Sequence, residues 1–457
     1  MNTPNWRETL NRPIKLPRLR FPRSRRAIAL LLSPFLAAML VGAWQARPFN
    51  AAREYPAPVA QIPSPNAHDF YVKAYQSIRS QPVSPILDSY TTAEEREKTN
   101  YPLAAKQRWL QDNQKGFAIF EEAQKQAYWL PPNLGDATGI AEANLYEMRW
   151  LARYKTVEIE VLGAQKQSEK AVNKALDLWK MGLDMGNGAH LIPALGGIAV
   201  EAMARKALNS EITHLNGLEA ARAAQRLEKL LPTRVPVADV WKRERVDFLS
   251  KLPKAFAEGA YNQWRDAEFE RRYARDEEMP PYKVPEPSPL NFRLNWQIRQ
   301  QAQQLARGYN FLIADAPASW HNRQKKLPEF LGPNPKVASL MSKSSGSRFF
   351  FARAETQGNL FLARLALHAF RKDTGAYPEK LGELAPKYLE NAPLDPLSDG
   401  QILRYRRDGN RYKLWSIGPD ERDDGGKPAE NPAAKRPSSR YFVTEEMSGD
   451  IVANIND

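Results

Sequence analysis

The chain has 457 residues, contains no cysteine and carries a formal net charge of +14. This length allows two or three domains of roughly 100–200 residues each. The absence of cysteine excludes disulfides, a cysteine-linked lipid anchor, thiolate metal sites and cysteine nucleophiles.

Half of the net charge lies in residues 1–26, which hold eight basic residues and one acid, a net +7 of the total +14. A basic stretch next to an apolar segment is typical of the cytoplasmic side of a membrane anchor. Elsewhere, basic residues are mixed with acids along expected helices, as on a solvated surface. The charge therefore does not predict nucleic-acid binding.

Residues 27–46, "AIALLLSPFLAAMLVGAWQA", contain no charged side chain. About 20 helical residues span the ~30 Å hydrocarbon core of a bilayer. With the basic stretch before it, this segment predicts a single-pass inner-membrane anchor, a cytoplasmic tail at residues 1–26 and a periplasmic location for the rest. A cleaved signal peptide, with "VGA" at residues 41–43 as its cleavage site, and a buried helix of a soluble protein are the alternatives.

Four segments are expected after the anchor. Residues 47–66 form a Pro-rich linker, and residues 67–278 have the periodicity of a helical domain. Residues 279–344 combine a Pro-rich break with a helical connector, and residues 345–457 form a smaller domain. The fold class is mainly α, with antiparallel helix pairs in a bundle or short solenoid.

Apolar spacing predicts helices over Tyr101–Trp129, Ile140–Leu162 and Leu218–Leu231. "MGNG", residues 185–188, predicts a turn between two further antiparallel helices. A helix over Arg293–Ala314 is expected in the connector.

The last part of the chain begins with an amphipathic helix over Ser347–Thr374, which Gly375 ends. The serine-rich stretch "SKSSGSR", residues 342–348, is interpreted as a linker before this helix. Two strand-like runs then flank "RDGN", residues 407–410, and an Asp-Gly pair in this position predicts a β-hairpin. A small α+β domain is therefore expected.

The succession "DTGAYPEKLGEL", "PLDPLSDGQILRY", "YKLWSIGPDERDDGG" and "GDI" resembles the periplasmic domain of the major (G-type) pseudopilin of type II secretion systems. The resemblance covers residues 345–457, fused here to an anchored helical envelope domain. It implies a pilin-like layout, with a long helix against a short antiparallel sheet. Envelope or secretion-system proteins are the partners that it implies.

The resemblance also implies calcium binding in the C-terminal loop, by Asp420, Asp450 and the Ile417 carbonyl, with Asp423 and Asp424 as substitutes. The residue types agree, because Ca²⁺ takes 6–8 oxygens from carboxylates and backbone carbonyls on flexible loops. An acidic surface turn that needs no ion is the competing interpretation.

No zinc-protease, serine-hydrolase, P-loop or dinucleotide-binding motif is present, so the sequence predicts neither a catalytic residue nor a small-molecule substrate. The expected function is a non-enzymatic interaction or assembly module of the envelope. One alternative is an envelope hydrolase for polysaccharide or lipid, with acids gathered from several helices. Another is a lipid- or ligand-binding module lined by tryptophans. Eight tryptophans raise this last alternative, although core packing is their default role: Trp109, Trp129, Trp150, Trp179, Trp241, Trp264, Trp296 and Trp320.

Overall fold

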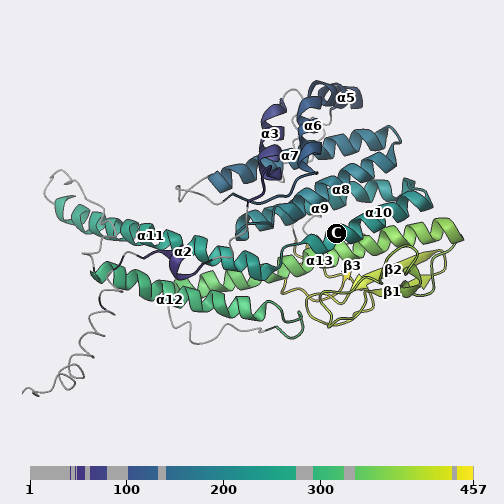
Figure 1. Cartoon of the computed structure of the whole chain (residues 1–457). Helices are drawn as coiled ribbons and strands as arrows, with labels where there is room; N and C mark the ends of the chain where they lie inside the picture. Colours follow the sequence, from purple (N-terminus) through teal and green to yellow (C-terminus); the bar gives the residue numbers. More distant parts are fainter. Residues whose placement is uncertain are drawn as a thin grey trace, which may run out of the picture. The chain divides into compact units, whose positions relative to one another are not determined.

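The computed structural model describes residues 42, 47, 49–56, 62–79, 101–131, 140–273, 292–323, 335–434 and 440–455. The protein is mainly helical, and its described part contains a small three-stranded antiparallel sheet (Figure 1). Residues 50–254 and 301–457 form one compact unit, and residues 1–49 and 255–300 form another.

The anchor predicted at residues 27–46 lies outside the described residues, apart from Gly42. Within the described ranges, no helix is both long and apolar enough to cross a membrane.

The larger unit holds most of the helices. The helices of the described chain are α2 (Ala51–Glu54), α3 (Ala67–Ser77), α5 (Leu103–Asp112), α6 (Gln114–Ala123), α7 (Ile140–Ala164), α8 (Ser168–Asp184), α9 (Leu191–Glu211), α10 (Gly217–Leu230), α11 (Val237–Tyr273), α12 (Phe292–Asp315) and α13 (Pro335–Thr374). Short 3₁₀ helices are η2 (Ile212–His214), η3 (Leu231–Thr233) and η5 (Leu381–Leu384). The predicted turn between α8 and α9 is confirmed, with Gly188 at φ +77°. Helices α8, α9, α10 and α13 pack side by side, while α3 and α6 lie against each other and α3 also contacts α7 (Figure 1).

The prediction of one helix over Tyr101–Trp129 is wrong, because the chain breaks at Asn113. The Asn113 side chain accepts a hydrogen bond from the Arg79 backbone N–H (2.7 Å) and donates to the Trp109 carbonyl (2.7 Å). These bonds compete with a continuous helical ladder. Helix α6 then ends at Ala123, and Trp129 makes two backbone hydrogen bonds to the Asn66 side chain at the start of α3.

The interpretation of residues 342–348 as a linker is also wrong, because α13 begins at Pro335 and includes them. Ser344 and Ser347 are buried, and the Trp241 indole N–H donates to the Ser347 hydroxyl (3.1 Å). The Ser347 hydroxyl in turn donates to the Ser344 carbonyl. Two buried serines, one of which bonds within the helix, show that this part of the stretch is packed, which a flexible linker would not be.

The predicted hairpin is confirmed. Strands β1 (Arg404–Asp408) and β2 (Arg411–Ser416) pair antiparallel, and β3 (Ile451–Val452) pairs with the other edge of β2. The turn holds Gly409 at φ +56°, a conformation that glycine adopts without steric cost. Gly375 ends α13 at φ +84°, as expected.

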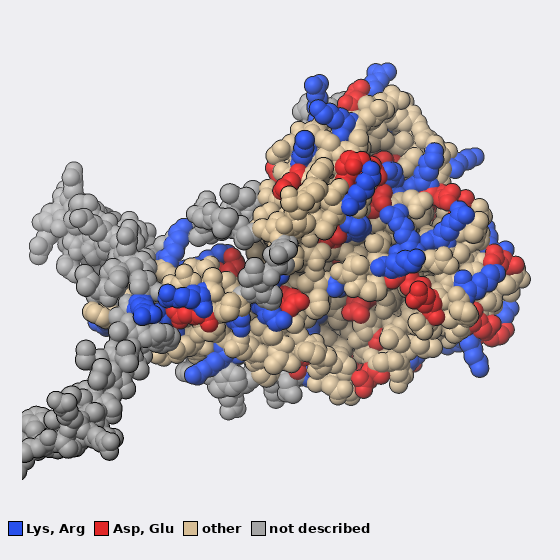
Figure 2. All heavy atoms as spheres, viewed as in Figure 1, with Lys and Arg blue, Asp and Glu red and all other residues tan. Residues whose placement is uncertain are grey.

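One hydrophobic cluster runs from Ala67 to Ala453, so the C-terminal segment shares a core with the helices before it. Helix α13 contacts α9, α10 and β2, which makes it the element that joins them. Trp109, Trp179, Trp241 and Trp320 are buried, which confirms core packing for these four. On the face shown in Figure 2, basic and acidic side chains are interspersed among the other residues.

Candidate functional site

The acids predicted to bind calcium lie where two segments meet, residues 417–426 after β2 and residues 449–450 before β3. We call these two segments the acidic loop. The Asp420 carboxylate accepts a hydrogen bond from the Gly449 N–H (3.2 Å). The Asp450 carboxylate accepts from the Gly426 N–H (2.6 Å) and the Asp424 N–H (3.3 Å). The structure therefore brings Asp420, Asp424 and Asp450 into one loop, next to the end of the strand that precedes Ile417.

Asp450 is fully buried, and burial raises its pKa to about 6, with the charges of Asp423 and Asp424 adding to the shift. The carboxylate oxygens of Asp420 and Asp450 are engaged by N–H donors, so the acids fasten the loop. Within the described residues, no three acidic or histidine side chains converge on one point. A calcium ion would share these carboxylate oxygens with their N–H donors or displace the donors. Calcium binding by Asp420, Asp424, Asp450 and Ile417 stays a prediction.

Asp395 is a buried acid that the sequence interpretation did not single out. Its carboxylate accepts from the Ser416 hydroxyl (2.7 Å) and from the N–H groups of Ile417 and Leu397 (both 3.0 Å). Burial raises its pKa. Asp395 therefore holds the end of β2, from which the acidic loop starts. The feature of the sequence that could have indicated Asp395 is the Asp-Pro pair of "PLDPL".

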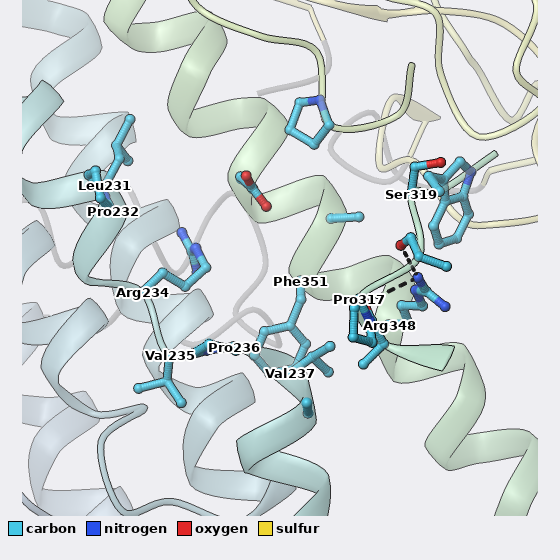
Figure 3. Close-up of a pocket in the computed structure, with 17 residues that line it drawn as sticks. Leu231, Pro232, Arg234, Val235, Pro236, Val237, Pro317, Ser319, Arg348 and Phe351 are labelled. Carbon is cyan, nitrogen blue, oxygen red and sulfur yellow. Dashed lines mark hydrogen bonds between the residues drawn. The ribbon is translucent and has the colours of Figure 1, made fainter. Parts of the chain in front are cut away.

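A surface groove of about 530 Å³ lies elsewhere in the same compact unit, and the sequence interpretation missed it. Its walls come from residues 231–232 and 234–238, residues 316–320, Pro396 and the face of α13 that carries Arg348, Phe351 and Glu355 (Figure 3). We call it the proline groove, because Pro232, Pro236, Pro317 and Pro396 line it. Its volume lies within the ~300–1,000 Å³ range of ligand pockets.

The two arginines that line the proline groove already have strong partners. Arg234 makes a bidentate salt bridge to Glu201, which also accepts from the buried Trp179 indole N–H (3.0 Å). Arg348 pairs with Asp315 and donates to the Ala318 carbonyl (2.6 Å), as the dashed lines to the backbone in Figure 3 indicate. These charges are neutralised by groups of the protein itself.

Glu355 differs from both arginines. It is exposed, yet the walls of the proline groove surround it, so desolvation raises its pKa even though Arg234 acts in the opposite direction. Among the described residues, its carboxylate has neither a hydrogen bond nor an ion pair. Glu355 is also the one carboxylate among the described residues that line the proline groove.

A smaller recess of about 280 Å³ adjoins the proline groove and shares Trp320 and Arg348 with it. Here Arg323 stacks on the Trp320 ring at 3.5 Å and pairs with Glu421 (2.6 Å). Burial raises the pKa of Glu445, which lines the same recess. On the side of the recess, the Trp320 ring is therefore held in place by Arg323, which stacks on it and is itself paired with Glu421.

The chemistry of the proline groove favours binding. Its walls are rigid, because proline fixes the backbone φ angle and Trp320 is held from behind. Among the described residues that line it, apolar side chains stand together with a single carboxylate, that of Glu355. Compared with protein-family models, curated proteins and solved structures, the chain matches none.

Proposed function

We propose that the protein is a non-enzymatic, inner-membrane-anchored interaction module of the cell envelope, which holds a segment of a partner protein in the proline groove. The observation that carries the proposal is this groove, with apolar walls, neutralised arginines and the exposed carboxylate of Glu355 in its lining. A rigid apolar groove with few polar groups is typical of recognition sites. The uncharged segment at residues 27–46 supports anchoring, with the larger part of the chain in the periplasm.

We also propose that α13 and strands β1–β3 form a pilin-like unit at the end of a helical bundle. The long helix contacts β2, and the sheet order β1-β2-β3 is antiparallel. These two features support the resemblance to the major pseudopilin. In this unit, the acidic loop is the segment proposed to bind calcium.

Site-specific photo-crosslinking in living cells tests the interaction. A photoreactive residue replaces Ala352, which lines the proline groove, or Leu218, which is 60% exposed on α10. We expect a discrete adduct from position 352 and none from position 218. An equal yield from both positions, or none from position 352, would refute the groove as the interaction site.

Reporter fusions at the C-terminus test the location separately. A reporter that is active only in the periplasm should be active, while a reporter that fluoresces only in the cytosol should remain dark. The opposite pattern would refute the anchored topology and leave the groove experiment interpretable.

A further inference from the structure

We infer that the partner segment is extended and proline-containing, and that it places a lysine or arginine side chain against Glu355. The inference rests on the proposed function, since it names the chemistry of the partner that the proline groove holds.

Charge complementarity favours a cation at Glu355. Glu355 is the charged group of the proline groove for which the described chain supplies no hydrogen bond or ion pair, while Arg234 and Arg348 are held by Glu201 and Asp315. A cation that approaches Glu355 therefore gains a carboxylate without breaking an existing salt bridge. An anionic segment would meet repulsion from Glu355 and would have to displace Glu201 or Asp315 to reach either arginine.

The surroundings of Glu355 strengthen the attraction. Desolvation by the walls already raises the pKa of this carboxyl, which means that water stabilises its charged form less than usual. A lysine or arginine head that pairs with the carboxylate would restore that stabilisation. Its aliphatic stem would lie along apolar wall residues such as Val235 and Phe351.

The walls also indicate the shape of the segment. A polyproline II segment is already extended before it binds, so it loses little conformational entropy when it docks on apolar walls. Here Trp320 and Phe351 lie buried behind the lining, and the apolar surface that the groove presents comes from exposed prolines such as Pro232 and Pro236. Since Ala318 already uses its carbonyl to accept from Arg348, a segment with few backbone N–H groups loses little here.

Fluorescence anisotropy with labelled heptapeptides tests the inference on the full chain in detergent. The probes alternate proline and leucine around a central lysine, glutamate or norleucine. We expect the lysine peptide to bind most tightly and Glu355→Gln to weaken it about tenfold, between the effects of exposed and buried ion pairs. Glu169→Gln, which makes the same charge change on the exposed surface of α8, should leave binding unchanged.

A second variant distinguishes the contribution of the Glu355 charge to peptide binding from the contribution of the space in the proline groove. Ala238→Trp fills the proline groove from the first turn of α11 and should weaken all three peptides alike. Equal affinity for the lysine and glutamate peptides, full binding by Glu355→Gln, or no binding of any peptide would overturn the inference. If crosslinking at position 352 succeeds in such a case, the proposed function stands and only the chemistry of the partner is wrong.

Discussion

Substitution of Gly197 by alanine tests the closest helix contact of the fold, the crossing of α8 and α9. A Cβ atom at Gly197 would lie 2.4 Å from the Gly182 carbonyl oxygen, and a Cβ at Gly182 would lie 2.8 Å from the Gly197 oxygen. Carbon–oxygen contacts between packed helices are ordinarily ~3.3–3.6 Å. The two backbones must therefore separate by about 1 Å to admit one methyl group, because backbone atoms cannot rotate away.

The size of the effect follows from two opposing contributions. Replacing glycine by alanine inside a helix stabilises it by about 1 kcal/mol. Overpacking against a rigid neighbour costs about 1–3 kcal/mol, and occasionally more. Since α8 and α9 form a tightly packed pair in the shared core, the separation also loosens the contacts around Trp179 and Val200. We expect Gly197→Ala to lower the free energy of unfolding by about 0–2 kcal/mol, and always to leave it below that of a helix-only Gly→Ala change.

Thermal melting followed by circular dichroism measures this, with Gly346→Ala as the matched control. Gly346 lies in α13, and a Cβ there would meet no atom within 4 Å. The control should therefore melt at the same or a slightly higher temperature, by the helix-propensity gain alone. If Gly197→Ala melts as high as Gly346→Ala, the close crossing and the reasoning built on it are wrong.

Three further predictions concern charges in the fold. Lys155 is fully buried, with its ammonium 3.1 Å from Glu121 and bonded to Glu158, so Lys155→Ala should lower the free energy of unfolding by about 3–5 kcal/mol. Lys155→Met keeps the side-chain volume and should therefore lower it less. Equal losses of the two variants in urea unfolding would contradict this. The pKa of Asp450 is about 6 in the folded protein, above the ~3.9 of an unfolded chain, so the folded protein binds the carboxyl proton of Asp450 more tightly. The stability that Asp450 contributes should therefore fall as pH rises from about 4 to about 6. Asp450→Asn should flatten urea midpoints across this interval, and an unchanged slope would show that another group causes it. Calcium at about 1 mM should raise the melting temperature of the wild type and leave the double variant Asp420→Asn, Asp450→Asn unchanged. A wild type that responds equally to magnesium, or not at all, would remove the calcium proposal.

Local signals accounted for much of the secondary structure. Helix α8, the turn through Gly188, the hairpin at Gly409 and the helix end at Gly375 were predicted, because apolar periodicity and turn residues act over a few positions of the chain. The existence of acids in the C-terminal loop was also visible. The sequence did not show that these acids accept hydrogen bonds from the N–H groups of Gly426 and Gly449. Those bonds form only because residues 449–450 approach a loop more than twenty positions earlier in the chain.

Two errors show where local reasoning stops. Asn113 breaks a helix because Arg79, 34 positions away, presents an N–H group to its side chain. The serine-rich stretch before Arg348 is helical because Trp241, 106 positions from Ser347, packs on it and donates a hydrogen bond. In each case a distant partner changed the balance between the local alternatives.

The sequence by itself determined that the chain is mainly helical, that it closes with a hairpin, and that an uncharged segment follows a basic tail, since each depends on neighbouring residues alone. The tertiary structure decided which charged side chains are paired within the protein and which remain accessible to a partner. Glu201 reaches Arg234 across 33 positions, and Glu355 lines the proline groove because four separate segments of the chain meet there. Burial and pairing are properties of assembled surfaces, and residues far apart in the chain acquire them only when the helices pack.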